Sequence, residues 1–269
     1  MKGSLLRFFL LTFTVTWTCF LAVIALGGFP PGTPRPWLRA LLFLGVVAPA
    51  MVALALTARA EGSAGVRALL DRIAKLQVSA RWYVFALGYL VAIKLAAALV
   101  HHLLFGTWPR FNTETWYLML AAIPISTVVQ AGEELGWRGY ALPRLAERMG
   151  LGLASIALGV LWALWHLPLF YLVGVESYGQ SFVPYLLQVT AISVAMAWLY
   201  WRTHMSLVLV MLMHAAINNT KDIVPSALRA PTHPFTPDAS PIAWIGATLM
   251  WIVAVYFLVR MRGAKLTAS

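Results

Sequence analysis

The sequence is poor in cysteine and in charge. Cys19 is the sole cysteine among 269 residues, so the chain forms no internal disulfide and holds no metal through a cysteine cluster. Charged residues make up 11% of the chain, against about 25% in a typical soluble domain. Hydrophobic residues make up 61%, and the mean hydropathy is +0.79. This composition excludes a soluble globular domain and predicts a protein that crosses the membrane several times.

Acidic residues are scarcer than basic ones, at 9 against 20, which leaves a formal net charge of +11. A strongly basic chain can bind nucleic acid, but such proteins gather lysine and arginine on one face or in a tail. Here the basic residues stand at the ends of apolar runs. That distribution is typical of topology signals and of attraction to anionic lipid head groups. We therefore expect the lipid bilayer, and no nucleic acid, as a partner.

Apolar runs of spanning length predict a single all-α membrane domain over residues 1–269, a polytopic helical bundle. Proline, glycine or charge clusters separate about eight such runs. They cover residues 5–27, 37–58, 81–104, 115–140, 151–173, 182–201, 204–220 and 241–261. Residues 62–80 instead mix basic and acidic side chains with leucine, isoleucine and valine. That pattern predicts an amphipathic helix at the membrane interface.

The distribution of lysine and arginine predicts the orientation of these helices. With eight spans and both termini in the cytoplasm, five basic residues lie outside and one, Lys94, lies within a span. The other 14 lie inside: Lys2, Arg7, Arg59, Arg67, Arg72, Lys75, Arg81, Arg138, Arg144, Arg148, Arg202, Arg260, Arg262 and Lys265. The wealth of alanine, leucine, arginine and tryptophan is typical of prokaryotic proteins. We therefore expect a protein of the prokaryotic plasma (inner) membrane with both termini in the cytoplasm.

Two adjacent acids interrupt the fourth apolar run. An ionised carboxylate at membrane depth costs at least about 2.5 kcal/mol, so Glu133 and Glu134 require compensation. Glu134 and Arg138 are four residues apart on a helix, with the acid first, which favours an ion pair. Glu133 points about 100° away and is left to face a cavity, where a partly desolvated carboxylate can act as a general base. The alternative is a structural ion-pair cluster at a helix end.

Two further polar clusters lie in apolar runs. Trp162 and His166 share a helix face, and Pro168 predicts that the helix ends or bends there. His214 and Asn218 lie one turn apart, with small alanines between them that favour close helix packing. Each cluster has a structural alternative: a satisfied core histidine in the first case, and a hydrogen bond between two helices in the second.

Together the three clusters supply a carboxylate, two histidines and an asparagine to one membrane domain. This set suffices for water activation and oxyanion stabilisation in amide hydrolysis. Glutamate and histidine also suit zinc, with Glu133, His166 and His214 as candidate ligands, although no HExxH helix is present. We expect no obligatory cofactor and keep zinc as an open possibility.

The order of the clusters resembles the CAAX protease and bacteriocin-processing family of intramembrane proteases. The resemblance covers residues 115–220, the expected catalytic core, and reads Glu-Glu-x-x-x-Arg, aromatic-x-x-x-His and His-x-x-x-Asn. The family usually has phenylalanine at the position of Trp162. The resemblance implies that Glu133 activates water with help from His166, and that Glu134 and Arg138 order the site. It also implies that His214 and Asn218 hold the oxyanion. The resemblance leaves open whether the enzyme is a glutamate protease or a metalloprotease.

The expected function is hydrolysis of a peptide bond in a membrane-embedded or lipidated substrate, such as a prenylated CAAX protein or a leader peptide. We expect the cavity to open towards the cytoplasm, because Glu133 lies close in sequence to the cytoplasmic arginines. The alternative is a non-proteolytic bacteriocin-immunity or scaffold protein, a role also associated with the family. A proton-coupled transporter ranks last, since the sequence shows no matching halves of the kind that many transporters contain.

Overall fold

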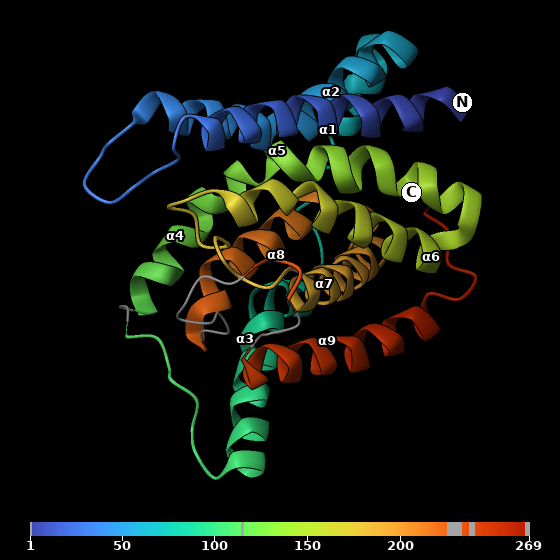
Figure 1. Cartoon of the computed structure of the whole chain (residues 1–269). Helices are drawn as coiled ribbons and strands as arrows, with labels where there is room; N and C mark the ends of the chain where they lie inside the picture. The colour runs from blue at the N-terminus through green and yellow to red at the C-terminus, as the bar shows by residue number, and fades with distance from the viewer. Residues whose placement is uncertain (1, 114–115, 225–232, 237–239, 267–269) are drawn as a thin grey trace.

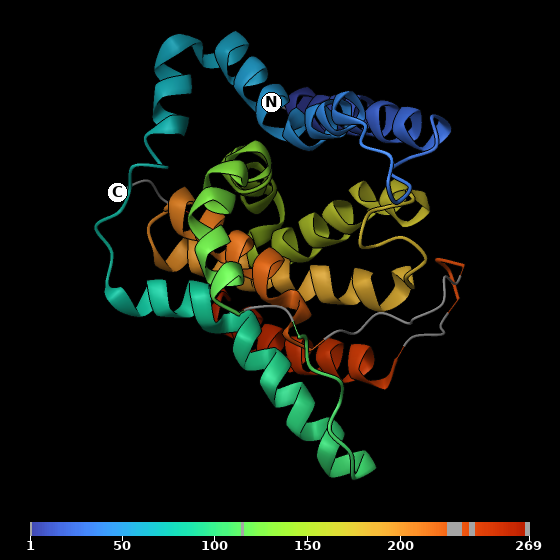
Figure 2. The same ribbon diagram turned by 90° about the vertical axis from the view of Figure 1, so that its left-hand side faces the viewer.

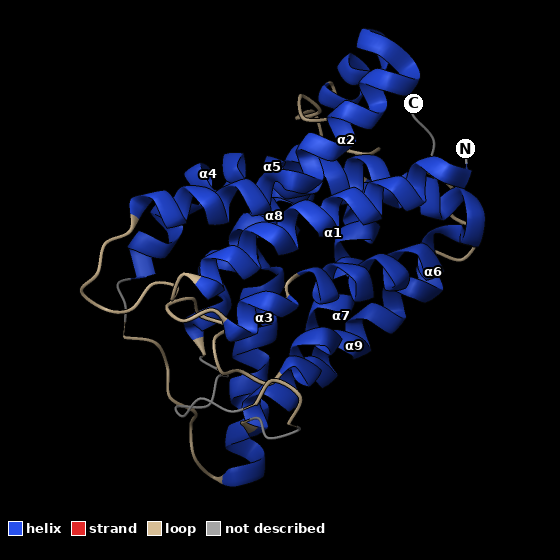
Figure 3. Cartoon of the chain, turned by 45° about the horizontal axis from the view of Figure 1, so that its top comes forward, coloured by secondary structure: helices blue, strands red, loops and turns tan. Residues whose placement is uncertain are grey.

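The computed structural model describes residues 2–113, 116–224, 233–236 and 240–266, and in these ranges every regular element is helical (Figure 3). The predicted all-α fold is therefore confirmed. The α-helices are α1 (Lys2–Ala25), α2 (Pro36–Leu70), α3 (Ala80–Phe105), α4 (Trp116–Val129), α5 (Ala131–Glu134), α6 (Leu142–Trp165), α7 (Phe182–Arg202), α8 (Leu207–Thr220) and α9 (Pro241–Arg260). The π-helix η1 (Leu135–Ala141) joins α5 to α6, and the 3-10 helices η2 (Leu167–Tyr171) and η3 (Lys221–Ile223) follow α6 and α8.

Six helical stretches of the described chain are long and apolar enough to cross a membrane, which makes this an integral membrane protein. One of them, Tyr117–Tyr171, is 55 residues long and holds two of the predicted spans. It is interrupted at Gly150, whose positive φ of 76° suits glycine and turns the chain back. α8 has 14 residues, fewer than the about 20 that a span requires. The predicted number of eight spans is thus approximate.

The predicted interfacial helix over residues 62–80 is only partly present. α2 bends at Gly62 and continues to Leu70, but residues 75–78 form no helix. This segment is tied to the bundle instead, because Lys75 Nζ donates to the carbonyl of His204 and Ser206 Oγ donates to the carbonyl of Lys75. Hydrogen bonds to the bundle replace the regular helix that the amphipathic pattern predicted.

The helices pack in layers, with α1 and α2 side by side on one face and α9 on the opposite face (Figure 1). α7 lies between α6 and α9, and α8 contacts α3 and α4. Glycine permits two close approaches in this core. A Cβ on Gly136 of η1 would lie 2.6 Å from the Pro49 carbonyl carbon of α2, and one on Gly159 of α6 would lie 2.7 Å from the Thr190 Cα of α7.

The bundle has two distinct ends, which we define by their connecting segments. Both chain termini lie at one end, the terminal end, together with residues 71–80 and 203–206 (Figure 2). The other, the loop end, is formed by residues 26–35, 106–113, 172–181 and 221–224. Its segments are joined by the hydrogen bonds from Phe29 N to the Val173 carbonyl and from Asn112 N to the Ile223 carbonyl.

Candidate active site

A buried network joins the acidic pair to α8. Arg138 Nη1 donates to both carboxylate oxygens of Glu134, at 2.9 and 3.2 Å. The His214 ring approaches the same carboxylate, with 2.8 Å between its Nδ1 and Glu134 Oε1. Glu134 and Arg138 are wholly inaccessible to solvent. The ion pair that the i,i+4 spacing predicted is present, and it is buried in the bundle instead of lying at a helix end.

The arginine of this network lies on η1, where the helix widens. π-helical turns inside α-helices occur frequently at functional sites. All seven residues of η1 are buried. The Arg138 guanidinium lies over the Trp162 ring, 4.2 Å from the ring centroid. In this way η1 presents one cation both to Glu134 and to the aromatic face of α6.

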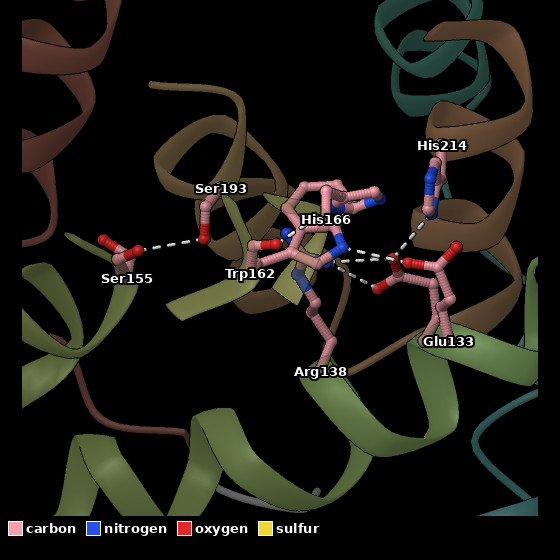
Figure 4. Close-up of polar contacts among 8 residues, drawn as sticks. Glu133, Arg138, Ser155, Trp162, His166, Ser193 and His214 are labelled. Carbon is pink, nitrogen blue, oxygen red and sulfur yellow. Dashed lines mark hydrogen bonds and ion pairs between the residues drawn. The ribbon is translucent and has the colours of Figure 1, made fainter. Parts of the chain in front are cut away.

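Glu133 has a different environment from Glu134. Its Oε2 accepts a hydrogen bond of 2.9 Å from Trp162 Nε1, and its second oxygen has no hydrogen-bond partner among the described residues (Figure 4). The side chain is 6% exposed. The two acids bond different partners, but these partners form one cluster, since Arg138 lies over the Trp162 ring and His214 packs against that ring. The sequence did not anticipate the indole donor to Glu133. The Glu134 carboxylate is bonded to Arg138 and His214, whereas Glu133 keeps an oxygen available.

His166 lies at the C-terminus of α6, where Pro168 was predicted to end the helix. α6 ends at Trp165, and His166 Nδ1 lies 2.8 Å from the carbonyl oxygen of Trp162. Since a carbonyl only accepts, Nδ1 carries the proton, and a neutral ring therefore has its lone pair on Nε2. Ser193 Oγ of α7 donates to the Ser155 carbonyl of α6 and joins these two helices on the side of Trp162 that faces away from Glu133 and His214 (Figure 4).

A cavity of about 550 Å³ connects the remaining site residues. Its inner part is lined by Trp162, His166, His214 and Asn218, so the second and third sequence clusters meet in one place. Asn218 is exposed, and no hydrogen bond occupies its side chain among the described residues. The structure therefore gathers all seven predicted site residues around one end of this cavity, with Glu133 held against its Trp162 wall.

The cavity opens at the loop end of the bundle. Its outer lining comes from residues 175–181 and from Lys221 and Asp222. We expected an opening towards the cytoplasm, which stays a prediction; the arginines on which it depended, Arg138, Arg144 and Arg148, do not line the cavity. The predicted span ended near Arg138, whereas the helical chain continues to Met149 before it turns. The basic residues that follow the site in sequence thus lie on the far side of the bundle from the opening.

Four charged residues line the cavity at the loop end, and the sequence analysis singled out one of them, Lys94. Lys94 of α3 lines the cavity, is 7% exposed, and donates to the Val224 carbonyl at 3.1 Å. Glu176 forms an ion pair with Lys221, and Asp222 lies beside them. Desolvation by burial raises the pKa of Glu176, although the Lys221 charge opposes the shift. Lys94 stood out in the sequence as a charge within a span, but its partners lie too far along the chain to be predicted.

The candidate zinc ligands do not form a preformed metal site. Among the described residues, no three histidine, cysteine, aspartate or glutamate side chains have the spacing to hold a metal ion. In this arrangement Glu133, His166 and His214 are therefore not spaced as the three ligands of a catalytic zinc.

Comparison with known proteins supports a family assignment for the segment that carries the site. Residues 115–220 match the family model described as type II CAAX prenyl endopeptidase Rce1-like. A curated relative, CAAX prenyl protease 2 of Methanococcus maripaludis, is 33% identical over 98 residues, which cover 34% of this chain. The match spans about a third, 36%, of the length of that relative. The resemblance predicted from the three polar clusters is confirmed, and it covers the helices that hold them.

Proposed function

Since residues 115–220 belong to the type II CAAX prenyl endopeptidase family, we propose that this chain is an intramembrane endopeptidase that hydrolyses a peptide bond of a membrane-associated substrate. One observation carries the proposal. Glu133, a buried carboxylate with an available oxygen, accepts a hydrogen bond from Trp162, and Trp162 lines a cavity of about 550 Å³ together with two histidines and an asparagine. General base, proton carrier and oxyanion donors are the groups that amide hydrolysis requires.

The proton transfers follow from the hydrogen bonds of the site. Glu133 removes a proton from water, and the hydroxide attacks the carbonyl carbon of the scissile peptide bond. His166 assists by accepting from the same water at Nε2, because its Nδ1–H is held by the Trp162 carbonyl. The C–N bond then breaks as the proton passes from Glu133 to the departing amine nitrogen. The protons balance, and the enzyme returns to its starting state.

Asn218 and His214 stabilise the oxyanion in this scheme. The Asn218 amide donates directly. Nδ1–H of His214 donates to Glu134, since a carboxylate only accepts. His214 therefore donates to the oxyanion from Nε2 only in the form with a proton on both nitrogens. Arg138 holds the Glu134 carboxylate that receives the Nδ1–H. Glu134 and Arg138 thus act through His214 and are positioning residues.

The substrate is proposed to be a lipidated or membrane-embedded peptide, either prenylated at a CAAX-type C-terminus or carrying a leader segment. We place the protein in a prokaryotic plasma membrane with both termini in the cytoplasm. The excess of basic residues at the terminal end supports this orientation.

Proteolysis in detergent or nanodiscs tests the function on a panel of prenylated and unmodified peptides. Glu133→Gln is expected to lower kcat by about 100-fold or more, the usual contribution of a general base. Glu147→Gln is the matched control, because it makes the same change on an exposed face of α6. Full cleavage by Glu133→Gln would refute the proposal and favour a non-proteolytic immunity or scaffold role.

A further inference from the structure

Three cations converge on a concavity at the terminal end, away from the candidate active site. The concavity has a volume of about 510 Å³. Arg81 of α3, Arg202 of α7 and Lys265, which follows α9, line it, and no acidic residue does. None of its lining residues lines the cavity of the candidate active site. Segments far apart in the sequence thus bring three positive charges to one small volume.

These cations lack a counter-ion in the described chain. No ion pair and no hydrogen bond among the described residues holds Arg81, Arg202 or Lys265. The Arg81 and Arg202 guanidinium groups instead lie 4.9 and 5.6 Å from the centroid of the Trp82 ring. Like charges that are gathered without an acid create a positive potential, and this potential attracts an anion.

Packing fixes the walls of the concavity. The Trp82 ring packs edge-on against Trp198, with 5.1 Å between the centroids, and Trp198 stacks on Phe257 of α9 at 4.3 Å. The turn after α7 is tied to the segment before α3, because Lys75 Nζ donates to the His204 carbonyl. A preorganised site loses little conformational entropy when a ligand binds, which favours affinity.

The turn that lines the concavity has a strained backbone. His204 and Met205 have φ values of 51° and 65°, in the left-handed region that glycine usually occupies after a helix. Hydrogen bonds from Met205 N to the Tyr200 carbonyl and from His204 N to the Trp201 carbonyl hold this conformation. Both residues with positive φ line the concavity. Strained backbone persists where its surroundings determine it, and such positions cluster at ligand sites.

We propose that this concavity binds a phosphate group, carried either by an anionic lipid head group or by a soluble phosphate. A phosphate monoester has three acceptor oxygens and about two negative charges, so several cations can bind it at once. Arginine presents parallel N–H groups that match phosphate oxygens, and lysine adds a point charge. The Gln77 amide and the Ser79 hydroxyl, which also line the concavity, supply neutral donors. The proposal does not depend on the proposed function, because the two cavities share no residue.

Displacement of a fluorescent phosphatidic acid from the detergent-solubilised full chain tests the ligand class. Unlabelled phosphatidic acid is expected to displace the probe at lower concentration than phosphatidylglycerol, and phosphatidylcholine, which has no net charge, should be the weakest competitor. Inorganic phosphate and glycerol phosphate, added to separate samples, identify the source of the phosphate. Displacement by either of them assigns a soluble ligand, and displacement by anionic lipids alone assigns a lipid head group. Equal displacement by phosphatidic acid and phosphatidylcholine overturns the proposal.

Substitutions of single cations test the location of the site. Arg202→Gln removes one cation from the concavity, and Arg260→Gln is the matched control, because each arginine is the exposed last residue of a helix. Arg202→Gln is expected to weaken binding of the probe about fivefold, the effect of one cation beside an anionic head group, and Arg260→Gln to leave it nearly unchanged.

Lys265→Gln provides a second measurement, because Lys265 reaches the concavity from a different segment. It should weaken binding of the probe by a similar factor. The unfolding midpoint of each variant, measured without lipid, shows whether the fold is retained. Equal effects of Arg202→Gln and Arg260→Gln, or unchanged binding in both Arg202→Gln and Lys265→Gln, overturn the proposal.

Discussion

At the scale of single residues, the two adjacent glutamates differ because their partners differ. Glu134 is bonded to Arg138 and His214, whereas Glu133 receives one indole N–H and keeps an oxygen available. Neighbours in sequence thus acquire separate functions through contacts from two other helices.

Trp162→Phe is expected to lower the free energy of unfolding by more than Trp165→Phe does. Both changes shrink a buried indole to a phenyl ring. Only the first removes a hydrogen bond, since Trp165 Nε1 has no partner in the described chain. The additional loss should be about 1–3 kcal/mol, because Glu133 Oε2 is left buried without its donor. Denaturant titrations of both variants in the same micelles measure the difference, and equal losses would show that the indole bond contributes nothing.

Metal chelation is expected to leave peptide hydrolysis unchanged. Glu133, His166 and His214 do not converge with metal-ligand spacing, and two of the three side chains are held by other partners. Zinc content and activity should be measured on the same sample before and after dialysis against a chelator. Stoichiometric zinc that is lost together with activity, and activity that zinc restores, would show that these ligands rearrange around a metal.

At the scale of elements, the Glu134 carboxylate of α5 connects to η1 through Arg138 and to α8 through His214. Glu134→Gln removes the negative charge that Arg138 and His214 share, and leaves a buried cation without its counter-ion. Breaking such a pair from one side costs about 3–5 kcal/mol. Glu61→Gln is the matched control, because it breaks a pair of the same 2.9 Å length on an exposed surface.

The Glu61→Gln control should change the unfolding free energy by about 0–1 kcal/mol, the usual worth of an exposed ion pair. Unfolding of both variants in one detergent compares the two pairs directly. A loss for Glu134→Gln that does not exceed that of Glu61→Gln would indicate that water or a rearranged partner compensates Arg138.

The elements also show what the sequence could and could not predict. Helical periodicity and apolar length predicted the spans, and i,i+4 spacing predicted the Glu134–Arg138 pair, because both are local properties. The His214–Glu134 and Trp162–Glu133 contacts join residues 80 and 29 positions apart. They depend on how helices pack and on where the chain turns. The same dependence places Arg144 and Arg148 away from the cavity, because the helical chain continues to Met149, beyond the predicted end of that span.

At the scale of the whole molecule, the bundle is polarised along its length. Its positive charge gathers at the terminal end, and its cavity opens at the loop end. The six spanning stretches are long and apolar enough to lie in the bilayer, and the excess of basic residues at the terminal end supports the proposed cytoplasmic placement of the termini.

The basic end is expected to make stability depend on anionic lipid. In nanodiscs, the thermal unfolding midpoint should be higher with phosphatidylglycerol than with phosphatidylcholine, because each cation near an anionic surface gains about 1 kcal/mol. The terminal end has a concavity of about 510 Å³ that Arg81, Arg202 and Lys265 line. The double variant Arg81→Gln/Arg202→Gln removes two of these cations and should lose most of the stabilisation by phosphatidylglycerol. Arg67→Gln/Arg260→Gln removes two exposed cations from the same end but outside the concavity, and should retain more of it. Equal losses from the two double variants would mean that the net charge of this end, and not the shape of the concavity, determines its affinity for lipid.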